Sequence, residues 1–162
     1  MGACLAKKQK EPDDTLVFNN SPILWSDTVP FVPPVSGGTC IKVYDGDTIT
    51  VATRLPFQGS PLYRFSVRLN GIDTPEIKGK TEDEKKLAVM ARDALSARIL
   101  NKEVELKNVA LEKYGRLLAQ VHVGKVCYND WLLENRYAVE YSGGTKVSPS
   151  NWMKFHKTGK TV

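Results

Sequence analysis

The sequence is poor in cysteine and histidine and contains no long hydrophobic run. Its 162 residues include 3 cysteines and 2 histidines. Cys4, Cys40 and Cys127 are too few and too scattered for a disulfide framework or a zinc site. No apolar run approaches the roughly 20 residues of a membrane-spanning helix, and the run Ala3–Ala6 is too short for a secretory signal. We therefore expect a cytoplasmic protein that is not secreted and does not itself cross a membrane.

Length, hydrophobic content and charge indicate one domain with an appendage. The chain is 41% hydrophobic and carries a net charge of +5. Residues 1–36 hold three Lys or Arg against four Asp or Glu, which leaves 20 against 14 for residues 37–162. Gly37-Gly38 marks the predicted boundary between a tail and arm (1–36) and the domain (37–162). A basic domain favours polyanions, although many basic domains bind none.

The N-terminus combines signals for lipid attachment. Gly2 is a candidate for myristoylation, Cys4 for palmitoylation, and three lysines between residues 7 and 10 would favour anionic lipid. These features predict a membrane anchor on the cytoplasmic face. The alternative is an unmodified, disordered tail, because Ala6 stands where the myristoylation pattern prefers Ser or Thr.

Residues 11–36 form a proline-punctuated arm without helical or strand periodicity. We expect the arm to lie extended on the domain and bury Trp25 or Phe31, or to bind a partner.

The domain reads as an α+β fold. Asp45-Gly46 is a tight-turn signal between two strands, Thr81 followed by Glu84 is a capping box, and Asn129 or Asp130 would cap the second helix. Alternating apolar residues predict strands at 39–44, 48–54, 63–70, 103–109 and 116–123; helices are predicted at 81–100, 129–136 and 148–157. Five strands with a helix between the third and fourth predict a five-stranded oligonucleotide/oligosaccharide-binding (OB) barrel with three helices.

The chemistry concentrates where the third strand ends, in the segment Arg68–Glu76. Arg68 offers a planar cation suited to phosphate, Asp73 a hard oxygen ligand, and Glu76 a carboxylate that could take a proton from water. These three groups are the parts of a phosphodiesterase. Taken alone, Asp-Thr-Pro-Glu is equally a turn and helix-entry signal.

A second acidic turn contributes Asp45 and Asp47. Asp47 and Asp73 come from different turns, and two carboxylates that converge repel each other unless a cation lies between them. With no His or Cys nearby, oxygen ligands favour calcium or magnesium over zinc. Ordinary turn chemistry is the alternative reading of Asp45 and Asp47.

A third motif, Glu112-Lys113-Tyr114-Gly115-Arg116, follows downstream. With all three motifs in this order, the sequence from Cys40 to Tyr141 closely resembles the staphylococcal (thermonuclease) nuclease family. That resemblance implies the same OB barrel, and Ca²⁺ held by Asp47, Asp73 and the backbone carbonyl of Thr74, with Asp45 orienting ligands or bound water.

The resemblance also implies a reaction on DNA and RNA. Glu76 would be the general base and Arg68 and Arg116 the clamp on the phosphate, with in-line displacement of the 5′-oxygen leaving 3′-phosphate ends. Contacts to the substrate phosphate or base are implied for Lys113, Tyr114 and Tyr141. A monomer acting on single strands is expected. The alternatives are a non-catalytic nucleic-acid-binding or protein-interaction module on the same fold, and a membrane-tethered adaptor.

Overall fold

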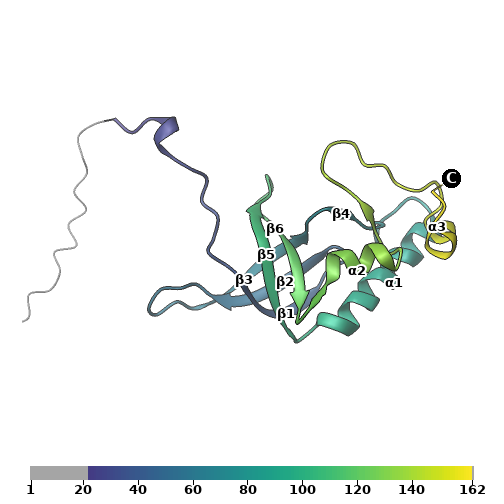
Figure 1. The fold of residues 1–162 in the computed structure, drawn as a ribbon, viewed down its shortest axis with the longest axis horizontal. Helices are drawn as coiled ribbons and strands as arrows, with labels where there is room; N and C mark the ends of the chain where they lie inside the picture. The colour runs from purple at the N-terminus through teal and green to yellow at the C-terminus, as the bar shows by residue number, and fades with distance from the viewer. Residues whose placement is uncertain (1–21, 162) are drawn as a thin grey trace, which may run out of the picture. The chain divides into compact units, whose positions relative to one another are not determined.

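The computed structural model describes residues 22–161 (Figure 1). The chain divides into two units, Met1–Phe31 and Val32–Val162. In the described part of the first unit, Trp25–Asp27 forms a short 3₁₀ turn, η1. Trp25 is 93% exposed. Burial of Trp25 or Phe31 by the domain stays a prediction.

The second unit is a closed barrel of five long strands. Strand β1 pairs antiparallel with β2 and with β5, β2 with β3, and β5 with β6. A parallel pairing between β3 and β6 closes the ring. The strands are β1 (Gly37–Val43), β2 (Thr48–Arg54), β3 (Leu62–Leu69), β5 (Glu103–Leu111) and β6 (Leu117–Val123). The predicted five-stranded barrel is confirmed.

Three helices gather on one side of the barrel, whereas the β2–β3 hairpin extends on the other (Figure 1). They are α1 (Glu82–Ile99), α2 (Tyr128–Glu134) and α3 (Trp152–Thr158). Helix α1 begins at the predicted cap, because the Thr81 side chain accepts a hydrogen bond from the Glu84 N–H. The Glu84 carboxylate does not complete the expected capping box; it accepts instead from the Lys80 N–H at 2.9 Å.

The core fills the barrel and the space beneath α1. Fully buried members include Ile49, Val67 and Leu69, whose alternation with polar residues in the sequence produced the strand predictions. Helix α1 adds a buried stripe of Leu87, Ala88, Ala91, Leu95 and Ile99. Ala94, next to Leu95 in the same helix, is only half-buried. Val35, from the segment assigned to the arm, also joins this core.

Three short strands were not predicted from the sequence, and the prediction that Asn129 caps the second helix is wrong. The short strands are β4 (Ile72–Asp73), β7 (Val126–Cys127) and β8 (Val139–Glu140). Asn129 lies inside α2, which begins at Tyr128, and caps nothing. Its buried amide instead accepts from the Val121 N–H and donates to the Asn70 carbonyl, which ties α2 to the barrel. Helix α3 begins at Trp152, after an Asn151 cap, and not at 148.

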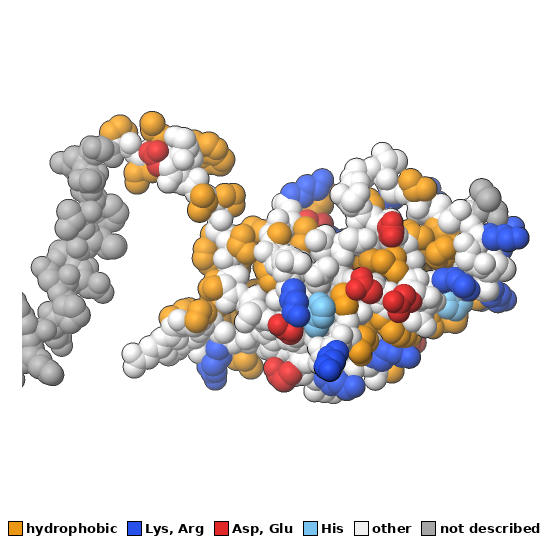
Figure 2. All heavy atoms as spheres, viewed as in Figure 1, with side chains coloured by type: hydrophobic (Ala, Val, Ile, Leu, Met, Phe, Trp, Pro, Cys, Tyr) orange, Lys and Arg blue, Asp and Glu red, His pale blue; other side chains and the backbone are white. Residues whose placement is uncertain are grey.

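Charged side chains are interspersed on the face drawn in Figure 2, where basic and acidic groups alternate without forming one large basic field. Any affinity for a polyanion on this face must therefore come from a local arrangement of groups and not from the net charge alone.

In the described part of the chain, no helix has the length and apolar character needed to cross a membrane.

Candidate active site

Two acidic turns meet at one end of the barrel. The turn between β1 and β2 carries Asp45, Gly46 and Asp47; its Asp47 N–H donates to Asp45 Oδ1 at 3.2 Å. Gly46 is buried against the second turn, because a Cβ added there would lie 2.9 Å from Cγ2 of Thr74. The absence of a side chain at Gly46 therefore allows the Asp47 turn to approach the turn that follows β4.

Arg68 joins the two acidic turns. The β2–β3 register places Arg68 opposite Thr48, next to Asp47. Its guanidinium donates to Asp47 Oδ2 at 2.6 Å and to Asp73 Oδ1 at 3.0 Å. Both carboxylates are buried, with Asp47 3% and Asp73 4% exposed. Burial acts to lower the pKa of Arg68, but the two carboxylates outweigh it and raise that pKa above its ordinary value.

Asp47 is the most perturbed acid of this group. Burial raises its pKa to about 6, even though the Arg68 cation and a hydrogen bond from Thr48 act in the opposite direction. Asp45 and Asp73 add to the increase because like charges disfavour ionisation. A buried carboxylate in this position gains from any additional positive charge that comes close.

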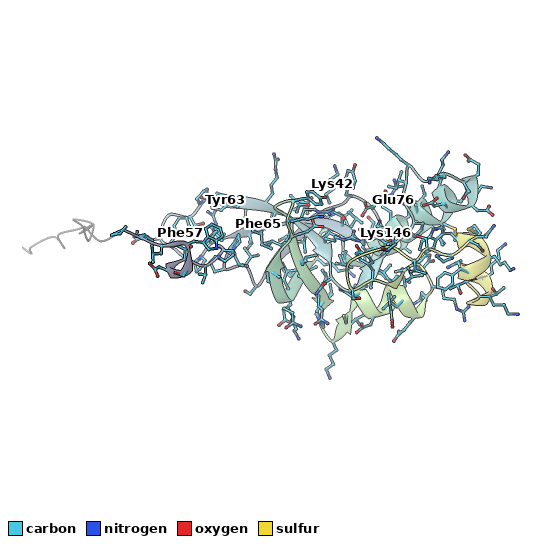
Figure 3. The ribbon with its side chains drawn as sticks, turned by 90° about the horizontal axis from the view of Figure 1, so that it is seen from above. Lys42, Phe57, Tyr63, Phe65, Glu76 and Lys146 are labelled. Carbon is cyan, nitrogen blue, oxygen red and sulfur yellow. The ribbon has the colours of Figure 1, made fainter. Side chains whose placement is uncertain are left out.

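Lys146 supplies a further positive charge to these carboxylates. Its Nζ lies 2.9 Å from Asp73 Oδ1 and 3.0 Å from Glu76 Oε1, and Figure 3 shows Lys146 and Glu76 side by side. Burial acts to lower the pKa of Lys146, but the hydrogen bonds to both carboxylates raise it overall. Lys146 lies in the loop between β8 (Val139–Glu140) and α3. The pairing of β4 with β8, in which Asp73 lies opposite Val139, fixes the start of that loop.

Arg116 lies immediately before β6, in the turn that follows β5, and is held by Glu112. Its Nε donates to Glu112 Oε2 at 2.6 Å and its Nη2 to Glu112 Oε1 at 2.9 Å. The bidentate hydrogen bond from Arg116 lowers the pKa of Glu112, and the same bond raises the pKa of Arg116. Glu112 occupies the Nε–Nη2 edge of the guanidinium, so Arg116 can bind a phosphate through its Nη1–Nη2 edge while Glu112 holds it in place.

These groups surround one cavity of about 350 Å³. Tyr141 lies on its wall, with its hydroxyl donating to the Gly144 carbonyl at 3.1 Å. All the predicted catalytic, metal and substrate residues line this cavity: Asp45, Asp47, Arg68, Asp73, Thr74, Glu76, Lys113, Tyr114, Arg116 and Tyr141. The structure thus brings together residues from four separate segments. Gly2 and Cys4 lie outside the described residues.

The donor set suits a hard divalent cation. Asp47, Asp73 and Thr74 offer carboxylate and carbonyl oxygens, the ligand type that Ca²⁺ and Mg²⁺ prefer. In residues 22–161, no group of three or more His, Cys, Asp or Glu side chains is arranged to hold a metal. Two carboxylates would therefore need the backbone carbonyl and water to complete a coordination shell. The residues fit such an ion by their chemistry.

Comparison with protein families gives one match. The family described as Staphylococcal nuclease homologue matches residues 66–157, which is more than half of the chain. The chain belongs to the staphylococcal nuclease homologue family. No curated protein is similar enough to count as a match.

Two further residues, Glu112 and Lys146, line this nuclease-like site and were not predicted to belong to it. Glu112 belongs to the third motif, and it pairs with Arg116 because the turn brings the two residues together, with the Glu112 N–H donating to the Arg116 carbonyl. Lys146 carried no such signal, because it lies in a Gly-rich loop without periodicity and reaches Asp73 only through tertiary pairing.

Proposed function

We propose that this protein is a calcium-dependent nuclease that hydrolyses phosphodiester bonds of DNA and RNA, with single strands favoured, and leaves 3′-phosphate ends. The observation that carries the proposal is the convergence of Arg68, Arg116 and Glu76 with the acidic pair Asp47 and Asp73 on a single cavity. Membership in the staphylococcal nuclease homologue family supports it.

Each side chain has a distinct task in this reaction. Asp47, Asp73 and the Thr74 carbonyl would hold Ca²⁺, which supplies Lewis-acid stabilisation of a phosphate oxygen. The side chain of Glu76 is 64% exposed, so it can reach water and accept a proton as that water attacks phosphorus.

The two arginines act on the charge that develops during attack. Arg68 is already fixed by Asp47 and Asp73, so its guanidinium is pre-organised toward the cavity. Arg116 donates to a phosphate oxygen through the guanidinium edge that Glu112 leaves free, and as the bond from phosphorus to the 5′-oxygen breaks, that oxygen takes a proton from water and leaves as a 5′-hydroxyl. Lys113 and Tyr114, beside Arg116 on the wall of the cavity, would contact a neighbouring phosphate of the substrate.

The test is cleavage of single-stranded DNA and RNA in calcium and in chelator, with end-group analysis of the products. Glu76→Gln and Arg116→Ala should each reduce turnover by about 10²–10⁴ while the fold stays intact. Asp47→Ala should weaken calcium binding and activity together. Glu134→Gln, on the exposed surface of α2, is the matched control for Glu76.

Two outcomes would contradict the proposal. Near-normal turnover of Glu76→Gln would remove its role as general base. Oligonucleotide binding by the wild type without cleavage in any divalent cation would favour the non-catalytic binding module instead.

A further inference from the structure

Two of the hollows that adjoin the catalytic cavity share arginines with it. A hollow of about 410 Å³ shares Arg68, Lys113 and Tyr141 with the cavity. A second hollow, of about 260 Å³, shares Asp45 and Arg116 with it. Each of these two hollows therefore adjoins the cavity at an arginine, Arg68 for the first and Arg116 for the second. The proposed function uses the cavity and the Lys113 side, but leaves the second hollow unused.

The second hollow lies on the outer face of β1, β2 and β3. Lys42 pairs with Thr50 across β1 and β2, and Thr50 pairs with Ser66 across β2 and β3. Ser66 precedes Arg68 by two residues on β3, so both face the same side of the sheet. Lys42, Thr50 and Ser66 thus form one row across the three strands. Arg68 lies in the next row on the same face of the sheet.

The side chains around the second hollow suit a nucleotide. Tyr44 is 60% exposed and offers a ring on which a base can stack. Lys42 Nζ lies 5.6 Å from the centre of that ring, so a cation and an aromatic face stand together. Among residues 22–161, Lys42 makes no ion pair, unlike Arg68, Arg116 and Lys146.

Other groups around this hollow are compatible with a phosphate. Thr50 and Ser66 contribute hydroxyl donors. Asp45 is the only acid on the wall in the described structure, and its Oδ1 is engaged by the Asp47 N–H. In Figure 3, Lys42 lies between the labelled aromatic residues of β3 and the pair of Glu76 and Lys146.

We propose that this hollow is a nucleotide subsite for single-stranded nucleic acid, next to Arg116 and distinct from the hollow that shares Lys113 with the catalytic cavity. Tyr44 stacks on the base and Lys42 contacts the phosphate of that nucleotide. The substrate strand continues past Arg116 into this subsite. The position of the subsite relative to the cleaved bond rests on the proposed nuclease function.

The test compares a dinucleoside monophosphate with a longer single-stranded DNA oligonucleotide, using fluorescence anisotropy and competition. Tyr44→Ala should weaken binding of the longer oligonucleotide about 5- to 100-fold, because one stacking interaction is lost, and should leave the short probe nearly unchanged. Tyr44→Phe should restore binding. Phe57→Ala, an exposed aromatic on the β2–β3 loop, is the matched control.

Lys42→Gln provides a second, independent measurement. Loss of one phosphate contact should reduce the slope of log affinity against log salt concentration by about 1. Lys125→Gln, at the exposed turn between β6 and β7, should leave the slope unchanged. Wild-type affinity and salt slope in both Tyr44→Ala and Lys42→Gln would overturn the subsite.

The outcomes separate the subsite from the nuclease. If the wild type cleaves nucleic acid and the Tyr44 and Lys42 variants match it on every substrate length, the subsite is wrong and the nuclease stands. If the wild type binds oligonucleotides through Tyr44 but never cleaves them, the subsite stands and the nuclease is wrong. A wild type that neither binds nor cleaves overturns both.

Discussion

Replacement of Lys146 by methionine should raise the affinity of the protein for calcium. The ammonium group of Lys146 lies 2.9 Å from Asp73 Oδ1 and 3.0 Å from Glu76 Oε1. A divalent ion that binds Asp73 must therefore share or displace this interaction. Methionine keeps the length of the side chain and removes its charge.

The expected gain in calcium affinity depends on how far Asp73 and Lys146 are exposed to solvent. Asp73 is buried, whereas the Lys146 side chain is 43% exposed. A hydrogen bond to a charged group contributes about 1.5–3 kcal/mol when well shielded, and solvent around Lys146 reduces this to about 1 kcal/mol. Arg68 still donates to Asp73 Oδ1 at 3.0 Å in the variant, so only the competition from Lys146 is removed, which should strengthen calcium binding about 5-fold.

Calorimetric titration of calcium in the absence of nucleic acid measures this directly. Lys146→Arg should retain the wild-type affinity because it keeps the charge, and Lys125→Met controls for the loss of a surface lysine. Thermal unfolding verifies that each variant is folded. Equal or weaker calcium binding by Lys146→Met would refute competition between the lysine and the metal.

Three other expectations concern packing, pH and lipid attachment. Gly46→Ala should destabilise the protein by about 1–3 kcal/mol, because the new Cβ would lie 2.9 Å from Cγ2 of Thr74; unchanged thermal unfolding would contradict this close packing. Burial raises the pKa of the Cys40 thiol to about 11, so the folded state binds more protons than the unfolded state between about pH 9 and 11 and loses about 2–3 kcal/mol of stability as pH rises through that window. Urea unfolding of Cys40→Ala should lack this decline, and an identical decline would rule out Cys40 as its source. For the N-terminus, we propose that acylation at Gly2 and Cys4 holds the protein on a membrane, so Gly2→Ala should release it and Cys4→Ser should leave weak, salt-sensitive attachment. Intact mass of protein from eukaryotic cells, with no acyl group added at Gly2, would disprove this anchor.

Local sequence signals predicted the long elements of the barrel. Alternation at the end of β3 and in β6 reflects one buried and one less buried face, and the Thr81 cap fixes the start of α1. The bend within β5 was not predictable: the strand continues to Leu111 past a register shift between Lys107 and Ala110, where Asn108 adopts a positive φ of 52°. A bulge depends on the partner strand, so the sequence of β5 alone does not specify it.

In the candidate site, too, some features follow from the sequence alone and others only from the tertiary structure. The sequence alone determined that Asp47, Arg68, Asp73 and Glu76 lie at strand ends and turns, because apolar alternation stops there and hard polar groups follow. Only the tertiary structure decided which charges meet. The register of β2 against β3 joins Arg68 to Asp47, and the two-residue ladder of β4 with β8 carries the loop of Lys146 to Asp73. Such pairings join segments distant in the chain and are selected by the packing of the whole barrel, which no local periodicity records.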